Sequence, residues 1–301
     1  MRSLRFGFRT APQHTTYEDM LTVWQEADDI PVIEHAWLFD HMAPIHSEVN
    51  GPCLEGWSTL AAFAAVTKRL RLGLMVTGNT YRNPAVLTKI ATTVDVISKG
   101  RLDFGIGAGW NEYEHASMGI PLFATGERIR RLDEACRIYK SLCTEHLTDF
   151  DGRYYQLKEA RNEPKPVQKP YPPIVIGGSG EQLTLKVVAK YADIWNFAGA
   201  TLETVGTFRH KIGVLREHCA TVGRDPEAIE LSMQTPVNYD DLDSTVQIVQ
   251  AFVDGGATHI IMDLRPPVPI GIMRRLASEV IPQITPSIAT TFDRHPGSGV
   301  A

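Results

Sequence analysis

Long apolar runs and paired cysteines are both missing from this sequence of 301 residues. No apolar run approaches the roughly 18–20 residues that span a bilayer, and the first residues are too poor in apolar side chains for a signal peptide. No C-x-x-C spacing occurs among the four cysteines, which are Cys53, Cys136, Cys143 and Cys219. We therefore expect a reduced, cytoplasmic protein with no membrane partner.

Positive charge is also scarce. The formal net charge is −5, and basic residues cluster only in pairs or mixed triplets, which argues against a nucleic-acid groove. The rest of the composition is ordinary, since 43% hydrophobic and 22% charged residues are typical of a soluble globular protein. A chain of this length can form one large domain or two smaller ones.

Glycine is concentrated at the ends of two strand-like runs. The first run ends at Gly105, Gly107 and Gly109, and the second runs into Gly177, Gly178, Ser179 and Gly180 before a helix. Because glycine at a strand end costs backbone order, it is expected where a ligand lies against the main chain. Two such junctions predict a large flat cofactor across the ends of parallel strands.

Short apolar runs alternate with longer helical patterns along the whole chain. Eight strands alternating with eight helices predict an α/β fold, a single (β/α)8 barrel. A doubly wound sheet is the alternative, but its glycines would stand at the first strand–helix turn, where residues 10–14 have none. The expected strands are 4–9, 35–40, 71–77, 101–107, 174–177, 193–197, 229–234 and 259–264, and the expected helices are 17–30, 55–68, 84–98, 126–146, 180–191, 201–222, 241–255 and 270–284.

One segment interrupts this alternation. Residues 147–172 contain a hairpin-like stretch at 149–157 and then a proline-rich stretch, so we expect an insertion between the fourth helix and the fifth strand. The barrel domain is expected to cover residues 1–285. Residues 286–301 lose the periodicity and are expected to form a flexible tail.

In a barrel of this kind, ligand-binding groups lie where strands end and loops begin. The set here is polar, aromatic and glycine-rich, without a nucleophilic serine turn, a strand-end lysine or a nearby pair of glutamates. A bound cofactor is therefore expected to carry the chemistry. The set comprises Arg9, Gln13, Asp40, His41, Val76, Thr77, Asn79, residues 107–111 and 177–180, Trp195, Asn196, Gln234 and Asp263.

His41 is the candidate catalytic residue. It follows Asp40 at the expected end of the second strand, and its imidazole titrates near neutral pH. Neighbouring strand residues point to opposite faces, so Asp40 can orient His41 only if the strand ends there. A loop histidine without a role is the alternative.

Two glycine-containing segments are candidate cofactor supports. The turn 177–180 precedes the expected helix 180–191, whose free amides and positive end suit a phosphate, although an ordinary glycine turn is possible. Gly73 and Gly78 interrupt the third strand, which predicts a bulge supporting a flat ring or simply a crowded strand–helix contact.

The remaining histidines predict no metal site. Glu112 and His115 have the spacing of a di-iron helix motif, but the required second copy is missing. His259 begins a buried strand and is interpreted as a hydrogen-bonded core residue.

Together these motifs resemble the luciferase-like flavin and deazaflavin oxidoreductases. The resemblance runs from about residue 4 to 285 and rests on Asp40-His41 and on the segments 76–84, 100–110, 126–134, 151–155, 164–178 and 191–196. It is strongest for the branch that uses the deazaflavin coenzyme F420. That family's fold, a (β/α)8 barrel, agrees with the alternation of strands and helices.

The resemblance implies a set of cofactor contacts. In the F420 branch the histidine after the second strand faces the reactive ring carbon, and a non-prolyl cis peptide, here near Met75–Val76, supports the ring. The turn 107–111 would contact the ring and ribityl chain, and the turn 177–180 would hold the phosphate. The implied cofactor-binding residues are Asp40, Met75, Val76, Thr77, Asn79, Gly107, Ala108, Gly109, Trp110, Asn111, Gly177, Gly178, Ser179 and Gly180.

The sequence departs from the sugar-phosphate dehydrogenase of that branch. Trp110 stands where that enzyme has a glutamate, and its phosphate-binding lysines and arginine have no clear counterparts here, so glucose 6-phosphate is not the expected substrate. We expect an F420-dependent hydride transfer to or from an apolar or aromatic small molecule, with the ring facing Trp110, Trp195 and Asn79, in a homodimer. An FMN-dependent monooxygenase and a non-catalytic flavin-binding barrel are the alternatives.

Overall fold

The computed structural model describes residues 2–45 and 48–286. In this part of the chain a parallel sheet closes on itself, because β3 pairs with β5 as well as with β2. The short β4 (Thr77–Gly78) continues β3 beside β5, so the ring has eight strand positions. In ring order the strands are β3 (Arg71–Leu74), β2 (Ile33–Leu38), β1 (Arg5–Thr10), β11 (His259–Leu264), β10 (Glu230–Pro236), β9 (Ile194–Phe197), β8 (Ile174–Gly177) and β5 (Leu102–Gly107).

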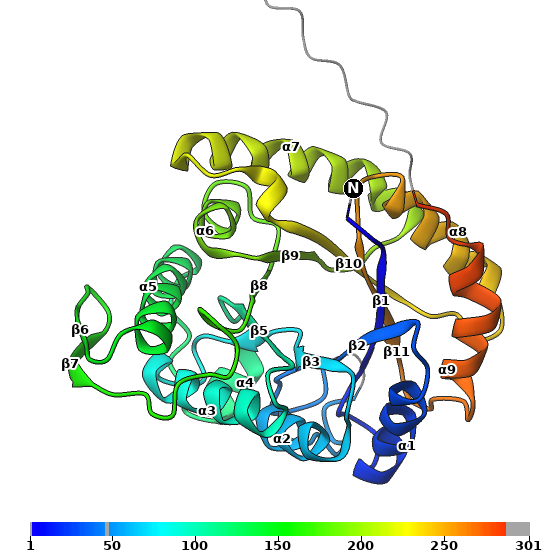
Figure 1. Ribbon diagram of the computed structural model, residues 1–301, viewed down its shortest axis with the longest axis horizontal. Helices are drawn as coiled ribbons and strands as arrows, with labels where there is room; N and C mark the ends of the chain where they lie inside the picture. Colours follow the sequence, from blue (N-terminus) through cyan, green and yellow to red (C-terminus); the bar gives the residue numbers. More distant parts are fainter. Residues whose placement is uncertain (1, 46–47, 287–301) are drawn as a thin grey trace, which may run out of the picture.

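Helices form a ring around these strands (Figure 1). This is the (β/α)8 barrel that the alternation predicted, and the doubly wound alternative is wrong. The helices are α1 (Tyr17–Asp28), α2 (Gly56–Val66), α3 (Pro84–Ile97), α4 (Glu112–Ser117), α5 (Thr125–Thr144), α6 (Thr184–Tyr191), α7 (Val205–Val222), α8 (Leu242–Val253) and α9 (Ile272–Arg275), which continues as a π turn (Leu276–Val280) and a 3-10 turn (Ile281–Gln283). Two further 3-10 turns are Leu202–Thr204 and Pro226–Ala228.

The strand residues alternate between the two faces of the sheet. Phe8 of β1 points outward and packs edge-on against Trp24 of α1, with ring centroids 5.7 Å apart, while its neighbour Arg9 points inward and pairs with Asp263. This alternation is the two-residue period of a strand with both faces buried. A small apolar cluster fills the barrel interior and consists of Trp37, Met75, Val175, Ile194 and Ile261, with Val76 packed against it.

Several details differ from the expectations. The second strand, expected at 35–40, is Ile33–Leu38, so Asp40 and His41 lie in the loop after it. The helix expected at 180–191 begins only at Thr184, and the strand expected at 71–77 is split between Leu74 and Thr77 by a cis peptide bond at Met75–Val76. The helix α4 was not expected, because residues 110–112 were interpreted as a polar turn. These details all lie at the carboxyl ends of strands.

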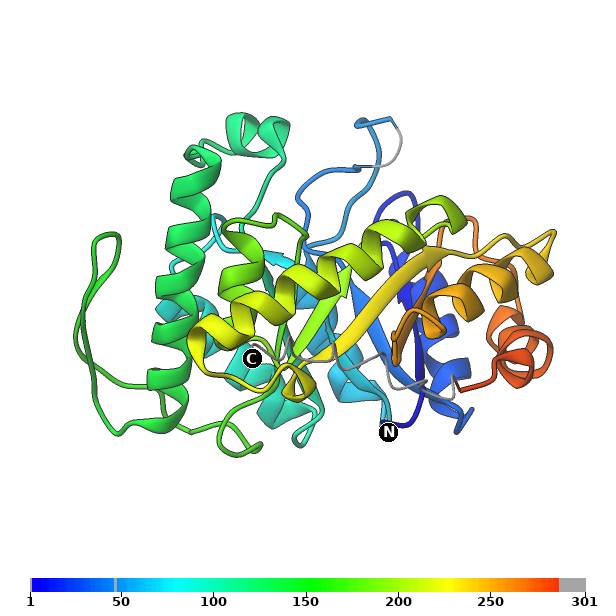
Figure 2. The same ribbon diagram turned by 90° about the horizontal axis from the view of Figure 1, so that it is seen from above.

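The insertion contains the expected hairpin, an antiparallel pair of β6 (Thr148–Asp151) and β7 (Gln156–Ala160). It projects to the side of the barrel (Figure 2). Most of the expected tail, residues 287–301, lies outside the described residues. Within the described part of the chain, no helix combines the length and apolar character needed to cross a membrane.

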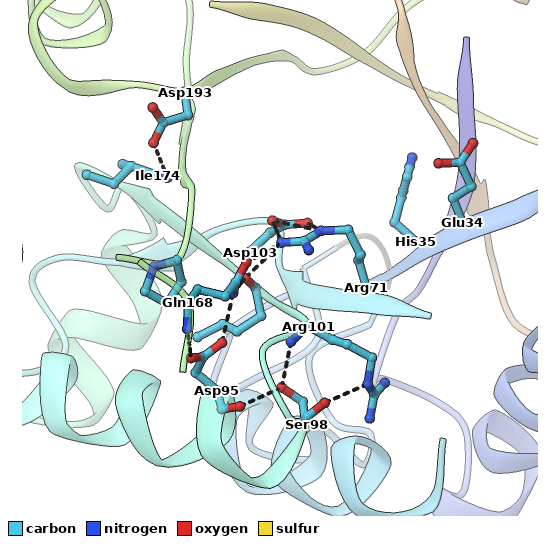
Figure 3. Close-up of polar contacts among 12 residues, drawn as sticks. Glu34, His35, Arg71, Asp95, Ser98, Arg101, Asp103, Gln168, Ile174 and Asp193 are labelled. Atoms are coloured by element: carbon cyan, nitrogen blue, oxygen red, sulfur yellow. Dashed lines mark hydrogen bonds and ion pairs between the residues drawn. The ribbon is translucent and has the colours of Figure 1, made fainter. Parts of the chain in front are cut away.

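The two ends of the barrel differ in their polar contacts. At one end, the described parts of the loop after β2, residues 39–45 and 48–55, project to the same side as the helix α4 (Figure 2). At the other end, Arg71 pairs with Asp103 at the amino ends of β3 and β5, and Gln168 of the insertion bonds Asp95 of α3 (Figure 3). The carboxyl-end face is where enzymes of this fold place their sites.

Candidate active site

A cavity of about 520 Å³ lies at the carboxyl ends of the barrel strands. Its size falls within the range of about 300–1,000 Å³ that is usual for small-molecule sites. Strand ends, the loop after β2 and the helix α5 all contribute to it. The lining residues are Arg9, Phe39, Asp40, His41, Ile45, Met75, Val76, Gly78, Tyr81, Gly107, Ala108, Gly109, Trp110, Thr125, Arg128, Ile129, Gly177, Gly178, Thr184, Asn196, Ala198, Gly199, Gln234, Pro236, Asp263 and Arg265.

One wall of the cavity is made mostly of main chain. The cis bond between Met75 and Val76 stands in the interruption between β3 and β4, as the family resemblance implied. Val76 packs so closely that a Cβ on Gly107 would lie 2.7 Å from its Cγ2 atom, and one on Gly177 would lie 3.3 Å from its Cγ1 atom. The two glycines and the valine therefore form a flat, largely apolar surface that suits a ring system.

The glycine turn after β8 forms the next part of the wall. Gly178 has a φ of +115°, a left-handed conformation that favours glycine. Its carbonyl accepts a hydrogen bond of 2.8 Å from Nε1 of Trp195, and a Cβ at this position would lie 3.1 Å from Thr184 at the start of α6. The turn is therefore held in place on both sides.

Arg128 of α5 supplies a positive charge to the lining of the same cavity. Its Nη1 donates to the Gly109 carbonyl at 2.7 Å, and its Nη2 donates to Oγ1 of Thr125 at 2.9 Å. Its Nε is buried and has no hydrogen-bond partner among the described residues. Arg128 lines the cavity, and a guanidinium in a cavity wall is suited to an anionic group such as a phosphate.

His41 lies in the cavity and is held by a carboxylate from a distant part of the chain. Its Nδ1 lies 2.8 Å from Oε2 of Glu114, which is completely buried in α4. The His41 ring packs edge-on between Phe39 and Trp110, at centroid distances of 5.1 and 5.6 Å. The ring is therefore fixed in both position and orientation.

Glu114 receives four hydrogen bonds. Its oxygens accept from His41, from the Tyr81 hydroxyl at 2.5 Å, and from the backbone amides of Met42 and Ala43. Burial alone would raise the pKa of Glu114, but the bonds from His41 and Tyr81 outweigh it and lower the pKa. An ionised Glu114 accepts the Nδ1 proton of His41, which leaves Nε2 as the basic nitrogen of the neutral ring.

Asp40 does not orient His41. Its buried carboxylate forms an ion pair with Arg82, with Nη1 2.6 Å from Oδ2, and accepts a hydrogen bond from Thr77. Burial raises the pKa of Asp40, and the Arg82 guanidinium opposes that rise. Arg82 also bonds Glu55, the residue that caps α2. Asp40 thus fixes the loop after β2, and Glu114 takes the orienting role that the sequence could not assign.

Most of the expected cofactor-binding residues meet at this cavity. Ten of the fifteen candidate residues line it, namely Asp40, His41, Met75, Val76, Gly107, Ala108, Gly109, Trp110, Gly177 and Gly178. Five candidates are not in its lining, namely Thr77, Asn79, Asn111, Ser179 and Gly180. Thr77 bonds Asp40, Asn79 bonds the Tyr155 hydroxyl, and Asn111 caps α4.

Two expectations about this region are corrected. The phosphate-binding turn does not run directly into a helix, because α6 begins at Thr184. Trp195 does not face the cavity. Side chains alternate along a strand, and that of Trp195 points outward, where its ring stacks on Phe208 of α7 with the ring centroids 5.7 Å apart. Its neighbour Asn196 points inward instead and lines the cavity. Asn79 Oδ1 is buried and lacks a partner in the described residues.

Sequence analysis also assigned no role to three residues of this region. Glu114, Tyr81 and Arg128 carried no role, although each contacts the site. No group of three or more possible metal ligands occurs among residues 2–45 and 48–286. His115, considered above as part of a metal motif, bonds the Asn111 carbonyl and the Thr80 hydroxyl instead.

Comparisons with known proteins agree with this fold. A profile of the luciferase-like monooxygenase family matches residues 4–270. The F420-dependent glucose-6-phosphate dehydrogenase of Amycolatopsis mediterranei is 30% identical over 191 residues, which cover 63% of this chain and 54% of that protein. The pyrimidine monooxygenase of Allorhizobium ampelinum is 31% identical over 205 residues, covering 64% of this chain and 54% of that protein. The matched region thus spans about half the length of these curated relatives.

A solved structure shows the same architecture. The F420-dependent secondary alcohol dehydrogenase in complex with an F420-acetone adduct superposes with a TM-score of 0.82, covering 94% of this chain and all of that chain at 19% identity. At this identity the likeness establishes the fold alone.

Proposed function

The chain belongs to the luciferase-like monooxygenase family, and from this membership and the cavity we propose that it is an oxidoreductase dependent on coenzyme F420. It would transfer a hydride between the bound deazaflavin and a small organic substrate. The observation that carries the proposal is a flat main-chain wall beside a buried His–Glu pair. A relative and a structural neighbour that are named for F420 support the choice of coenzyme.

The residues of the cavity fit a deazaflavin. The flat ring would lie against Val76, Gly107 and Gly177, which present backbone and one small side chain. The phosphate would lie by Gly178, Thr184 and Arg128, which all line the cavity and include the guanidinium charge of Arg128. When bound, the deazaflavin supplies the hydride acceptor or donor.

The His41–Glu114 pair would manage the proton that accompanies hydride transfer. Glu114 holds the neutral His41 as the Nδ1–H tautomer, so Nε2 can accept a proton from a substrate hydroxyl or return one to a carbonyl. The resulting imidazolium would be stabilised by the buried carboxylate 2.8 Å away. This division of labour between an acid–base imidazole and an orienting carboxylate recurs on many folds.

The substrate would be largely apolar at its reacting end. Trp110, Phe39 and Ile45 line the cavity around His41. Trp110 is 59% exposed and would shield bound substrate from water. Its aromatic face also suits an aromatic or lipophilic molecule better than a sugar phosphate.

The main rival is an FMN-dependent monooxygenase, which the pyrimidine monooxygenase among the relatives favours. Anaerobic titration with F420 and with FMN, followed by ligand fluorescence, separates the two. Tighter binding of F420, together with a reduced complex that consumes little oxygen, is the expected result. Tighter binding of FMN, or rapid oxygen consumption by the reduced complex, would overturn the proposal. Binding without turnover of any substrate would favour a flavin-storing barrel.

Three expectations stay predictions. These are the single barrel domain at residues 1–285, the homodimer and the cytoplasmic location. Sedimentation analysis of the purified protein would check the dimer.

A further inference from the structure

The side of the cavity formed by β1 and β11 carries a second cationic group. Arg9 and Asp263 are register partners on these adjacent strands, and both side chains are more than nine-tenths buried. Two parallel hydrogen bonds join them, from Nε to Oδ1 at 2.9 Å and from Nη2 to Oδ2 at 2.7 Å. A bidentate pair of this kind fixes the plane of the guanidinium.

The pairing leaves one side of Arg9 available. Its Nη1 makes a single long contact among the described residues, 3.5 Å to Oε1 of Gln234. Arg9, Gln234 and Asp263 all line the cavity. Asp263 therefore fixes the orientation of Arg9. The Nη1 group of Arg9 and the side chain of Gln234 are left at the cavity wall.

The charge of this side of the cavity is positive. Arg265 also lines the cavity, with its Nε 3.8 Å from Asp263, so two guanidinium groups share one carboxylate. Asp40, the other acidic residue of the lining, is already paired with Arg82. In a protein whose net charge is −5, a cation-rich cavity wall indicates an anionic ligand group.

This group is separate from the expected phosphate seat. The ring order places β8, which leads into Gly178, opposite β1. The helix α5, which contains Arg128, lies on the β8 side of the ring (Figure 1). Arg9 instead lies 6.0 Å from the ring of Phe39, whose other neighbour is His41. Phe39 is thus a neighbour of both the guanidinium of Arg9 and the imidazole of His41.

We infer that the substrate carries a carboxylate, that Arg9 binds it through Nη1, and that Asp263 positions Arg9 for this contact. The substrate is then an apolar molecule with an acidic end, lying along Phe39 with its reacting carbon near His41. This inference rests on the proposed function for the reacting end, but not for the carboxylate contact.

The test compares a carboxylate with its uncharged amide and needs no turnover. Hydrocinnamate and hydrocinnamamide are titrated by ligand-observed NMR into the protein, with and without saturating F420. The wild type should bind hydrocinnamate about tenfold more tightly, which corresponds to about 1.4 kcal/mol. Equal affinity for the two probes would overturn the inference.

The variant Arg9→Gln with Asp263→Asn removes both charges while keeping the shape of the pair. It should lose the preference for the carboxylate and keep its affinity for F420. A retained preference, or a loss of F420 affinity equal to the loss of hydrocinnamate affinity, would overturn the inference. If F420 fails to bind even the wild type, the proposed function fails while the carboxylate preference remains measurable.

A matched control removes a comparable pair elsewhere. Arg71 and Asp103 form an arginine–aspartate pair on neighbouring strands at the opposite end of the barrel (Figure 3). Arg71→Gln with Asp103→Asn should leave the carboxylate preference unchanged, and its loss there would count against a local role for Arg9. Should the Arg9 variant not fold, Gln234→Glu places a negative charge beside Nη1 and should weaken hydrocinnamate binding more than amide binding. Equal weakening of both probes by this variant would also overturn the inference.

Discussion

Mild acid should weaken the fold through two histidines stacked in the barrel interior. His35 of β2 and His259 of β11 lie face to face, with ring centroids 3.8 Å apart and planes 7° apart. Their stacking requires Gly7 on the strand between them, because a Cβ there would lie 1.9 Å from Nδ1 of His35. His35 Nδ1 accepts from Trp37 and His259 Nδ1 bonds Ser232, while both Nε2 atoms lack partners in the described part of the chain.

A second proton on His35 would go to Nδ1, which already accepts the Trp37 N–H, and both rings are close to positive charge. Burial lowers the pKa of His35 well below its usual value, with His259, Arg5 and Arg71 adding to the effect. Burial also lowers the pKa of His259, again with Arg5 and Arg71 adding to it. The native state therefore keeps both rings neutral at pH values where the unfolded chain binds protons.

The magnitude follows from proton linkage. An unfolded histidine has a pKa of about 6.5, so the stability contributed by a ring that stays neutral is full above that pH and is lost as the pH falls below it. Between about pH 7 and about pH 5.5 the loss is about 1.3 kcal/mol for each histidine and about 2.5 kcal/mol for both. This is a large part of the stability of an ordinary domain, which is about 5–15 kcal/mol.

Urea unfolding at the two pH values measures the effect. His259→Asn keeps a polar atom near Ser232 but cannot titrate, so its loss of unfolding free energy on acidification should be smaller than that of the wild type by about 1.3 kcal/mol. His146→Asn, at an exposed position, is the matched control and should behave like the wild type. If His259→Asn and the wild type lose the same free energy, the ring is not held neutral and the reasoning is refuted.

Four further predictions concern the cavity and the residues around it. His41→Ala should lower turnover by about 10²–10⁴ with little change in cofactor affinity; near-normal turnover per folded molecule in stopped-flow assays would remove it from the mechanism. Glu114→Gln should lower turnover by about tenfold or more and shift the pH–rate profile to lower pH, because the imidazolium loses its carboxylate; an unmoved profile would leave Glu114 a purely structural role. Gly178→Val should weaken F420 binding in a folded protein, since the left-handed φ and Thr184 exclude the side chain; unchanged affinity would move the phosphate elsewhere. Burial, with help from Glu114 and Asp40, raises the pKa of Cys53 to about 12, so iodoacetamide should alkylate it more slowly than a free thiol at about pH 8, as mass spectrometry would show.

The barrel itself was predictable because its signals are local and repeated. The strands 174–177 and 259–264 were predicted with the bounds that the structure shows, since each is a short apolar run with turn residues beyond its ends. The start of α3 could also be predicted from the sequence Asn83-Pro84. In the structure Asn83 caps the helix by accepting a hydrogen bond from the Ala85 amide, and Pro84 is the first helical residue. Patterns of this kind depend only on residues close in sequence, so they can be recognised without knowing the tertiary structure.

The facing of side chains was harder to predict. Trp195 was assigned to the cavity because it lies near a strand end, but Asn196 occupies the inward register and the tryptophan packs outside on Phe208. A shift of one residue reverses every side chain in a strand. All four residues of β9 are buried. The sequence therefore shows no polar–apolar alternation that would tell which of them point into the barrel and which point outward.

The His41–Glu114 pair shows a different limit. Asn111 accepts a hydrogen bond from the Glu114 amide at the start of α4, and a cap residue followed three positions later by glutamate is a recognised helix-start pattern. The sequence therefore held a signal for the helix, but none for its partner 73 residues earlier. In the fold, four hydrogen-bond donors surround the buried carboxylate of Glu114, and His41 is one of them. Burying the charge of Glu114 without these donors would cost too much free energy. A glutamate in this setting is not available as a surface charge. Its proposed role is therefore to hold His41, and the proposed chemistry would depend on both residues.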